Sequence, residues 1–141
     1  MAAFQKFSQF VEDLAKKVHN LDSDTLKIML TNSAPSSSNA VLADITEITA
    51  QNGYSAGGTT AAFVSGAQSA GTYKLVLGAV TFTASGGSIG PFRYAVLYNS
   101  TPTSPLKPLI GWWDNTSNVT LADGNSFSVN CDQTNGVLQL A

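Results

Sequence analysis

The sequence has very few of the residues that bind metals or act as nucleophiles and bases in catalysis. Cys131 is the only cysteine and His19 is the only histidine. One cysteine cannot form a disulfide within the chain, and a structural zinc site needs four ligands of the Cys and His type. A Cys/His or Ser/His/Asp site would have to be built around His19, which falls at the end of an expected helix. We therefore expect no metal, no cofactor and no catalytic residue, and we predict that the protein is not an enzyme.

Charged residues are also scarce, at 11% of the sequence, against about 25% in an average soluble domain. The net charge is −2, and the only adjacent basic pair is Lys16–Lys17. Nucleic-acid binders normally carry a basic patch, so we expect no nucleic-acid partner. A polar surface with little charge suits close packing against a neighbouring protein, because few charges must be desolvated. The same composition is typical of β-rich proteins with many turns, and both interpretations stay open.

Long hydrophobic runs are missing. No apolar stretch approaches the 18 or so residues that a membrane-spanning helix needs, so we expect no membrane partner. The N-terminal region reaches Glu12 and Asp13 without the apolar core of a signal peptide, which predicts a protein made in the host cytoplasm. Repeats and linkers are absent, and a chain of 141 residues suits one domain over 1–141.

The first part of the chain has the periodicity of an amphipathic helix, which we predict over 1–21. Apolar residues recur every three or four positions, and Phe10 widens the stripe that they form; its other members are Phe4, Phe7, Val11, Leu14, Val18 and Leu21. Either this stripe covers the domain's own sheet, or its phenylalanines dock on a partner.

After Asp24 the period changes to two, which predicts strands. Leu26, Ile28 and Leu30 are expected to face the core from a strand over 25–31. Further strands are expected over 60–64, 72–77, 79–84, 92–98, 108–114, 119–121, 126–131 and 137–140. The Asp123-Gly124 and Asn135-Gly136 steps indicate two final hairpins. The predicted fold class is mainly β: an antiparallel β-sandwich or barrel-like domain over 25–141, with one N-terminal amphipathic helix.

Two strands carry apolar residues on both faces, which is typical of a central position. In the first, Phe92, Tyr94, Val96 and Tyr98 are expected on one face, with the N-terminal helix covering the sheet. In the second, Trp112 and Trp113 must point to opposite sides, so at least one is expected near the surface. An exposed tryptophan would be an interface anchor or a platform on which a sugar stacks. The candidate protein-interface residues are therefore Phe4, Phe7, Phe10, Trp112 and Trp113.

Three stretches together resemble a known group of proteins. They are residues 4–15 with His19-Asn-Leu, the Leu26-Lys-Ile-Met-Leu-Thr-Asn-Ser-Ala-Pro segment, and the block from Gly86-Gly-Ser-Ile-Gly-Pro-Phe-Arg-Tyr through Pro108-Leu-Ile-Gly-Trp-Trp-Asp. In these stretches the chain resembles small structural proteins of tailed bacteriophages. The resemblance implies a virion component whose partners are the major capsid protein or other virion proteins.

Among virion roles, a capsid decoration (cement) protein on the capsid exterior is the first hypothesis. Symmetry would repeat each contact many times, so that each copy needs to add only modest binding. We expect a homo-oligomer, with trimers suited to threefold positions and dimers to twofold ones. The alternatives are a tail, neck or fibre-attachment subunit, or a module that binds host-surface glycans through Trp112 or Trp113 and Tyr54 or Tyr98.

Overall fold

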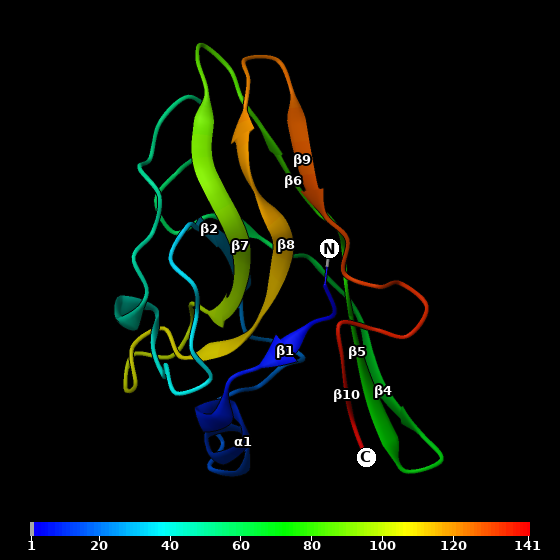
Figure 1. Cartoon of the computed structure of the whole chain (residues 1–141). Helices are drawn as coiled ribbons and strands as arrows, with labels where there is room; N and C mark the ends of the chain where they lie inside the picture. Colours follow the sequence, from blue (N-terminus) through cyan, green and yellow to red (C-terminus); the bar gives the residue numbers. More distant parts are fainter. Residues whose placement is uncertain (1) are drawn as a thin grey trace.

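Antiparallel strands dominate the computed structural model, which describes residues 2–141 (Figure 1). The largest sheet has the strand order β1 (Gln5–Lys6), β8 (Leu109–Leu121), β7 (Ile89–Asn99), β2 (Leu26–Thr31) and β3 (Thr59–Thr60). A second layer contains a three-stranded sheet of β10 (Leu138–Leu140), β5 (Thr72–Leu77) and β4 (Phe63–Ser69), and a two-stranded sheet of β6 (Val80–Thr83) and β9 (Ser126–Val129). The mainly β, sandwich-like prediction is confirmed, and the sheets do not close into a barrel.

The main core lies between these two layers. Leu26, Ile28 and Leu30 of β2 contribute to it from the large sheet, as their alternation predicts. Leu75 of β5 and Val129 of β9 contribute from the second layer. Because both small sheets send apolar residues to one shared cluster, they act together as the second face of the sandwich.

The outer face of the large sheet carries a second apolar cluster. Its members include Met29, Val96, Tyr98 and Trp112. The sequence predicted that the N-terminal helix covers this face. Instead, it is covered by Phe7 and by the segment around the short helix η1 (Leu42–Asp44) with Ile45. Apolar residues of an irregular loop, rather than a helix, therefore cover most of this face.

Strand β7 is central, between β2 and β8, as its two apolar faces predict. Val96 and Tyr98 lie in the outer cluster, whereas Ala95 and Leu97 lie in the main core. Phe92 was expected to share a face with Val96 but lies in the main core. The register of β7 and β8 shifts between Phe92 and Tyr94, and such a bulge reverses the alternation of side chains.

The N-terminal helix is shorter than the predicted 1–21. Helix α1 spans Ser8–Ala15, and the preceding residues are extended because β1 pairs with Gly111 and Trp112 at the edge of β8. The chain leaves the helical conformation by Lys17, which has a φ of 65°. The apolar spacing in this region therefore describes a strand followed by a short helix, both packed on the same body.

The two final hairpins predicted from turn residues are wrong. Gly124 and Gly136 do adopt the left-handed conformation that turns require, with φ of 83° and 81°. However, β9 pairs with β6 and β10 pairs with β5, so neither turn connects two paired neighbours. The turn after β8 instead carries the chain from the first layer to the second.

Candidate functional site

The five candidate interface residues are used mainly inside the domain. Phe7, Phe10, Trp112 and Trp113 are at most 8% exposed, and Phe4 is half-buried. The Phe4 and Trp113 ring centroids are 4.9 Å apart on the main-core side, and those of Phe7 and Trp112 are 4.6 Å apart on the outer side. The tryptophans do face opposite ways, but neither stands at the surface. The structure therefore agrees with the interpretation in which the phenylalanine stripe covers the domain's own sheet.

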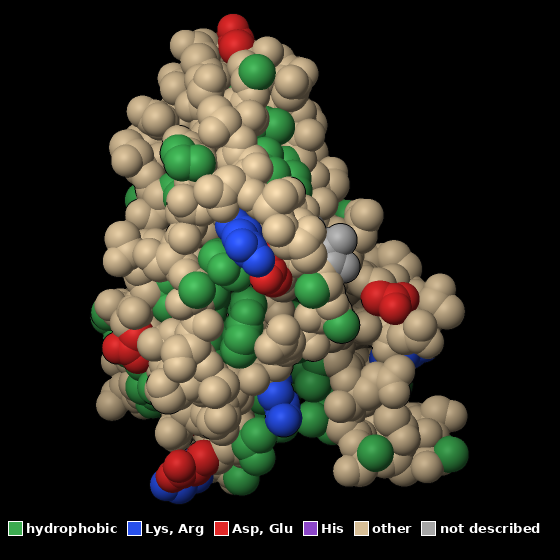
Figure 2. All heavy atoms as spheres, viewed as in Figure 1, with side chains coloured by type: hydrophobic (Ala, Val, Ile, Leu, Met, Phe, Trp, Pro, Cys, Tyr) green, Lys and Arg blue, Asp and Glu red, His purple; other side chains and the backbone are tan. Residues whose placement is uncertain are grey.

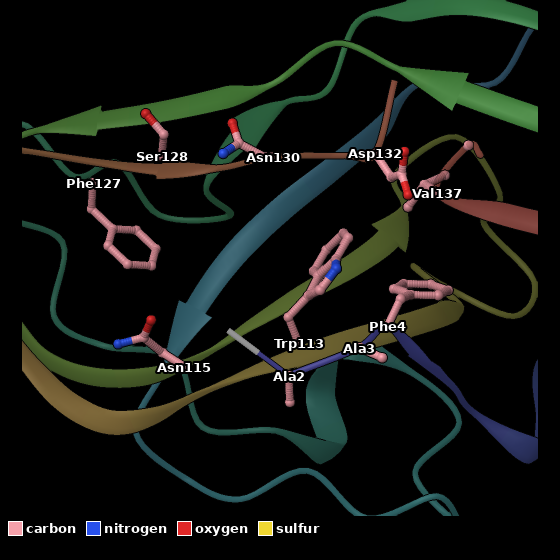
Figure 3. Close-up of a pocket in the computed structure, with 11 residues that line it drawn as sticks. Ala2, Ala3, Phe4, Trp113, Asn115, Phe127, Ser128, Asn130, Asp132 and Val137 are labelled. Atoms are coloured by element: carbon pink, nitrogen blue, oxygen red, sulfur yellow. The ribbon is translucent and has the colours of Figure 1, made fainter. Parts of the chain in front are cut away.

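A cleft of about 540 Å³ opens beside Trp113 (Figure 3). It lies between the N-terminal segment with β8 on one side and the chain from β9 to β10 on the other. The rings of Phe4, Trp113 and Phe127 turn into this space, whereas the side chains of Ser128 and Asn130 extend to the other side of their segment. Four separated stretches of sequence form the cleft, so no local pattern could have predicted it.

The cleft contains one titratable side chain among its lining residues, Asp132. Its carboxylate accepts hydrogen bonds from the backbone N–H groups of Thr134 (3.0 Å) and Asn135 (2.9 Å) and from the Asn135 amide. These bonds lower the pKa of Asp132. The carboxylate is therefore held in a turn, and glycoside hydrolysis would need a second one facing it. The cleft therefore combines apolar and polar lining residues, with Asp132 as its one carboxylate.

His19 and Cys131 are both buried. The Asn99 amide donates to Nδ1 of His19 (3.1 Å), and the Nε2 atom has no hydrogen-bond partner within 2–141. Burial lowers the pKa of His19, opposed by the nearby charges of Asp13 and Asp24. Burial raises the pKa of Cys131 to about 11, so its thiol stays protonated at neutral pH. Both residues are therefore in environments typical of a structural role in the core.

The tyrosines named for sugar stacking belong to a buried network. The Tyr54 hydroxyl donates to Glu47 (2.7 Å) and accepts from the backbone N–H of Leu30 (3.0 Å). The Tyr98 hydroxyl donates to the carbonyl of Gly57 (2.6 Å), whose N–H donates to Glu47. Burial and the Glu47 hydrogen bond raise the pKa of Tyr54. This network fastens the loop before β3 onto the large sheet, and it leaves neither ring face free.

Neither a metal cluster nor a membrane-spanning helix is found in the part of the chain that the structure describes. No three side chains of the His, Cys, Asp and Glu types come together there as metal ligands would. None of its helices combines the length and the apolar character needed to cross a membrane.

Within residues 2–141, large hydrophobic side chains are exposed at four positions. They are Val11 on α1 (53% exposed), Phe63 (43%) and Val64 (54%) on β4, and Leu106 (59%) in the loop between β7 and β8. These three elements lie in the lower half of the molecule, away from the turn that joins β8 to β9 (Figure 1). Charged side chains on the face seen in Figure 2 are few and scattered among uncharged groups. One end of the molecule thus offers apolar contacts, beside the exposed ion pair of Lys16 and Glu12.

The comparisons with known proteins add no assignment. No protein-family model matches the chain. Neither the curated proteins nor the solved structures give a significant match.

Proposed function

We propose that this protein is a structural subunit of a tailed-bacteriophage virion, and that it decorates the capsid exterior by binding the major capsid protein. In this role the protein holds protein surfaces together. The resemblance of its sequence to small phage structural proteins suggests the setting. The exposed apolar side chains at one end of the domain are the observation that carries the proposal.

The geometry suits attachment by one end. Val11 and Leu106 protrude from α1 and from the loop between β7 and β8, and the backbone ties this region to the body. The N–H of Ser8 donates to the carbonyl of Ser37 (2.9 Å), and the N–H of Leu42 donates to that of Lys107 (2.9 Å). A pre-ordered surface loses little conformational entropy on binding. Many copies on a symmetric shell then need only modest affinity each.

The test uses purified protein and expanded heads assembled without it. We expect the protein to bind these heads in hundreds of copies per particle and to raise the temperature at which they rupture. The variant Val11→Asp/Leu106→Asp should fold normally, because both side chains are exposed, and should lose most of the binding. Ala122→Asp/Asn125→Asp introduces the same two charges in the exposed turn at the other end and should bind like the unchanged protein. Heads that neither bind the protein nor gain heat resistance contradict the proposal.

The alternatives predict different copy numbers or ligands. A tail, neck or fibre-attachment subunit would be present in a few dozen copies or fewer per particle. A host-surface glycan-binding module would bind sugars as an isolated domain. Within the described residues, the aromatic rings first considered for sugar stacking are covered by the chain itself, which favours a protein-binding role over a glycan-binding one.

A further inference from the structure

We propose that β4 pairs in the antiparallel direction with β4 of a second copy of this chain, so that two three-stranded sheets join into one sheet across a twofold axis. The inference does not rest on capsid attachment, and its test uses the purified chain alone. It rests on the length, charge and register of one strand.

Strand β4 is the longest edge strand and has little protection against pairing. It spans Phe63–Ser69 and pairs on one side only, with β5. Natural proteins block open edges with very short strands, with lysine, with proline or with β-bulges. The other edge strands are short: β1 and β3 are two residues long, β10 is three, and β6 and β9 are four. By contrast, β4 has seven residues without proline or charge, and six of the seven are exposed. Its bulge lies between Phe63 and Ser65 and leaves residues 65–69 in a regular ladder.

Its hydrogen-bonding groups are arranged for a further strand. The turn after β4 consists of Ala70 and Gly71, both with positive φ, which is the two-residue hairpin in which Ser69 and Thr72 exchange backbone bonds. Bonded and non-bonded pairs alternate along an antiparallel ladder. Gly66 and Gln68 therefore direct their N–H and C=O groups away from β5, toward the open side.

The absence of charge argues that the occupant is a second copy. In a twofold pair the same strand lies against itself, so any charge near the axis meets its own like charge. No Asp, Glu, Lys or Arg lies between Glu47 and Lys74, a stretch that contains all of β4. A partner that is recognised through charge would find nothing to pair with here, whereas a copy of the same strand meets no repulsion.

The outward groups also fix the register. The axis passes through Ala67, so that Gly66 exchanges both outward backbone bonds with Gln68 of the second copy. Ser65 consequently lies opposite Ser69 of the other chain. This pairing uses only residues beyond the bulge between Phe63 and Ser65. Gly66 has no side chain to obstruct the approach of the second strand, and the rings of Tyr73 and Phe63 from its own chain fill the space above it.

A pair of charge variants tests this register. Ser65→Lys/Ser69→Lys places like charges opposite each other twice per dimer, whereas Ser65→Lys/Ser69→Glu places opposite charges there. Both alter the same two exposed positions, so their melting temperatures as monomers should match that of the unchanged chain. Sedimentation equilibrium at low salt should show a dimer for the unchanged chain. The dissociation constants of the two variants should differ by about 10- to 100-fold, with the Lys/Glu form tighter.

A cross-link gives a second measurement. In the proposed register Ala67 lies opposite Ala67 of the other chain, in a non-bonded pair whose side chains are close enough for a disulfide. The Ala67→Cys variant should form a covalent dimer under mild oxidation, whereas Ser65→Cys should not do so efficiently, because its two copies are offset by four residues. An unchanged chain that stays monomeric at millimolar concentration overturns the proposal. Equal weakening by both charge variants, or equal cross-linking by the two cysteine variants, also overturns it.

Discussion

At the scale of single residues, Asn99 is the polar centre of the core. Its buried amide donates to Nδ1 of His19 and to Asp24 (2.7 Å), and its carbonyl accepts from the N–H of Thr101 (3.1 Å). These bonds join the turn after α1 to the end of β7. Since the Asn99 amide donates to Nδ1, His19 is held as the neutral tautomer that carries its proton on Nε2.

This arrangement predicts a stability that falls in mild acid. The pKa of His19 in the folded chain lies below its ordinary value of 6.5, mainly because of burial. As the pH falls past about 6.5, the unfolded chain therefore takes up a proton before the folded one does, and the free energy of unfolding decreases. Urea denaturation between pH 7.5 and 5 should show this decline. The carboxylates with lowered pKa, such as Asp132 and Asp114, have ordinary values of 3.8, so they act in a more acidic range.

The His19→Asn variant is the control, because its side-chain oxygen can accept the Asn99 hydrogen bond without titrating. Its free energy of unfolding should be nearly independent of pH over the same interval. An equal decline in this variant would show that His19 is not the group that causes the effect.

At the scale of elements, the sequence predicted strands better than their partners. Period-two alternation located β2, and the predicted 72–77 matches β5. Pairing depends on contacts between distant segments, so the glycine turns after β8 and β9 did not reveal that β9 joins β6 and β10 joins β5. The N-terminal helix was predicted to be longer than it is. A spacing of three between the phenylalanines fits one continuous helix, but it also fits a strand followed by a short helix. Backbone pairing with β8 decided between them.

The edge contact between β1 and β8 depends on a glycine. A Cβ atom at Gly111 would lie 2.5 Å from the carbonyl oxygen of Gln5 and closer still to the Phe4 ring. We predict that Gly111→Ala lowers the free energy of unfolding by about 1–3 kcal/mol through this overlap. It should also detach residues 2–7, which limited proteolysis can detect.

Gly78→Ala is the matched control. A Cβ atom there would meet Ala62 at 3.6 Å, an ordinary van der Waals distance. Its stability should stay close to that of the unchanged chain, and its N-terminal segment should remain protected. Equal protease sensitivity in the two variants would mean that the close approach at Gly111 is not what holds β1.

At the scale of the whole molecule, two apolar clusters share one sheet. Adjacent residues of β2 enter different clusters, Met29 the outer one and Leu30 the main core, and both are fully buried. We predict that Met29→Ala and Leu30→Ala each lower the free energy of unfolding by about 2–5 kcal/mol. In each variant the tryptophan-fluorescence and far-ultraviolet circular-dichroism transitions should coincide, because neither cluster persists without the shared strands. A separate early transition in Met29→Ala would show that the outer cluster unfolds alone.

The candidate surfaces were harder to predict than the fold. Large aromatic residues such as Trp112 and Phe7 attract attention in a sequence, but the same apolar area favours burial. The strand expected over 60–64 overlaps only the start of β4 (Phe63–Ser69), because the small residues over 65–69 give no apolar alternation. The signal that could have found it is the long stretch without charge between Glu47 and Lys74.

The open edge of β4 has a consequence for the free chain. Backbone groups accept any extended segment, so an unoccupied edge does not distinguish its proper neighbour from a partly unfolded chain. The bulge between Phe63 and Ser65 limits this hazard, because it bends the strand and confines the flat part to its second half. Before assembly, the open edge of β4 can therefore pair with a second copy or with a partly unfolded chain. The short run of small residues in β4 allows both outcomes.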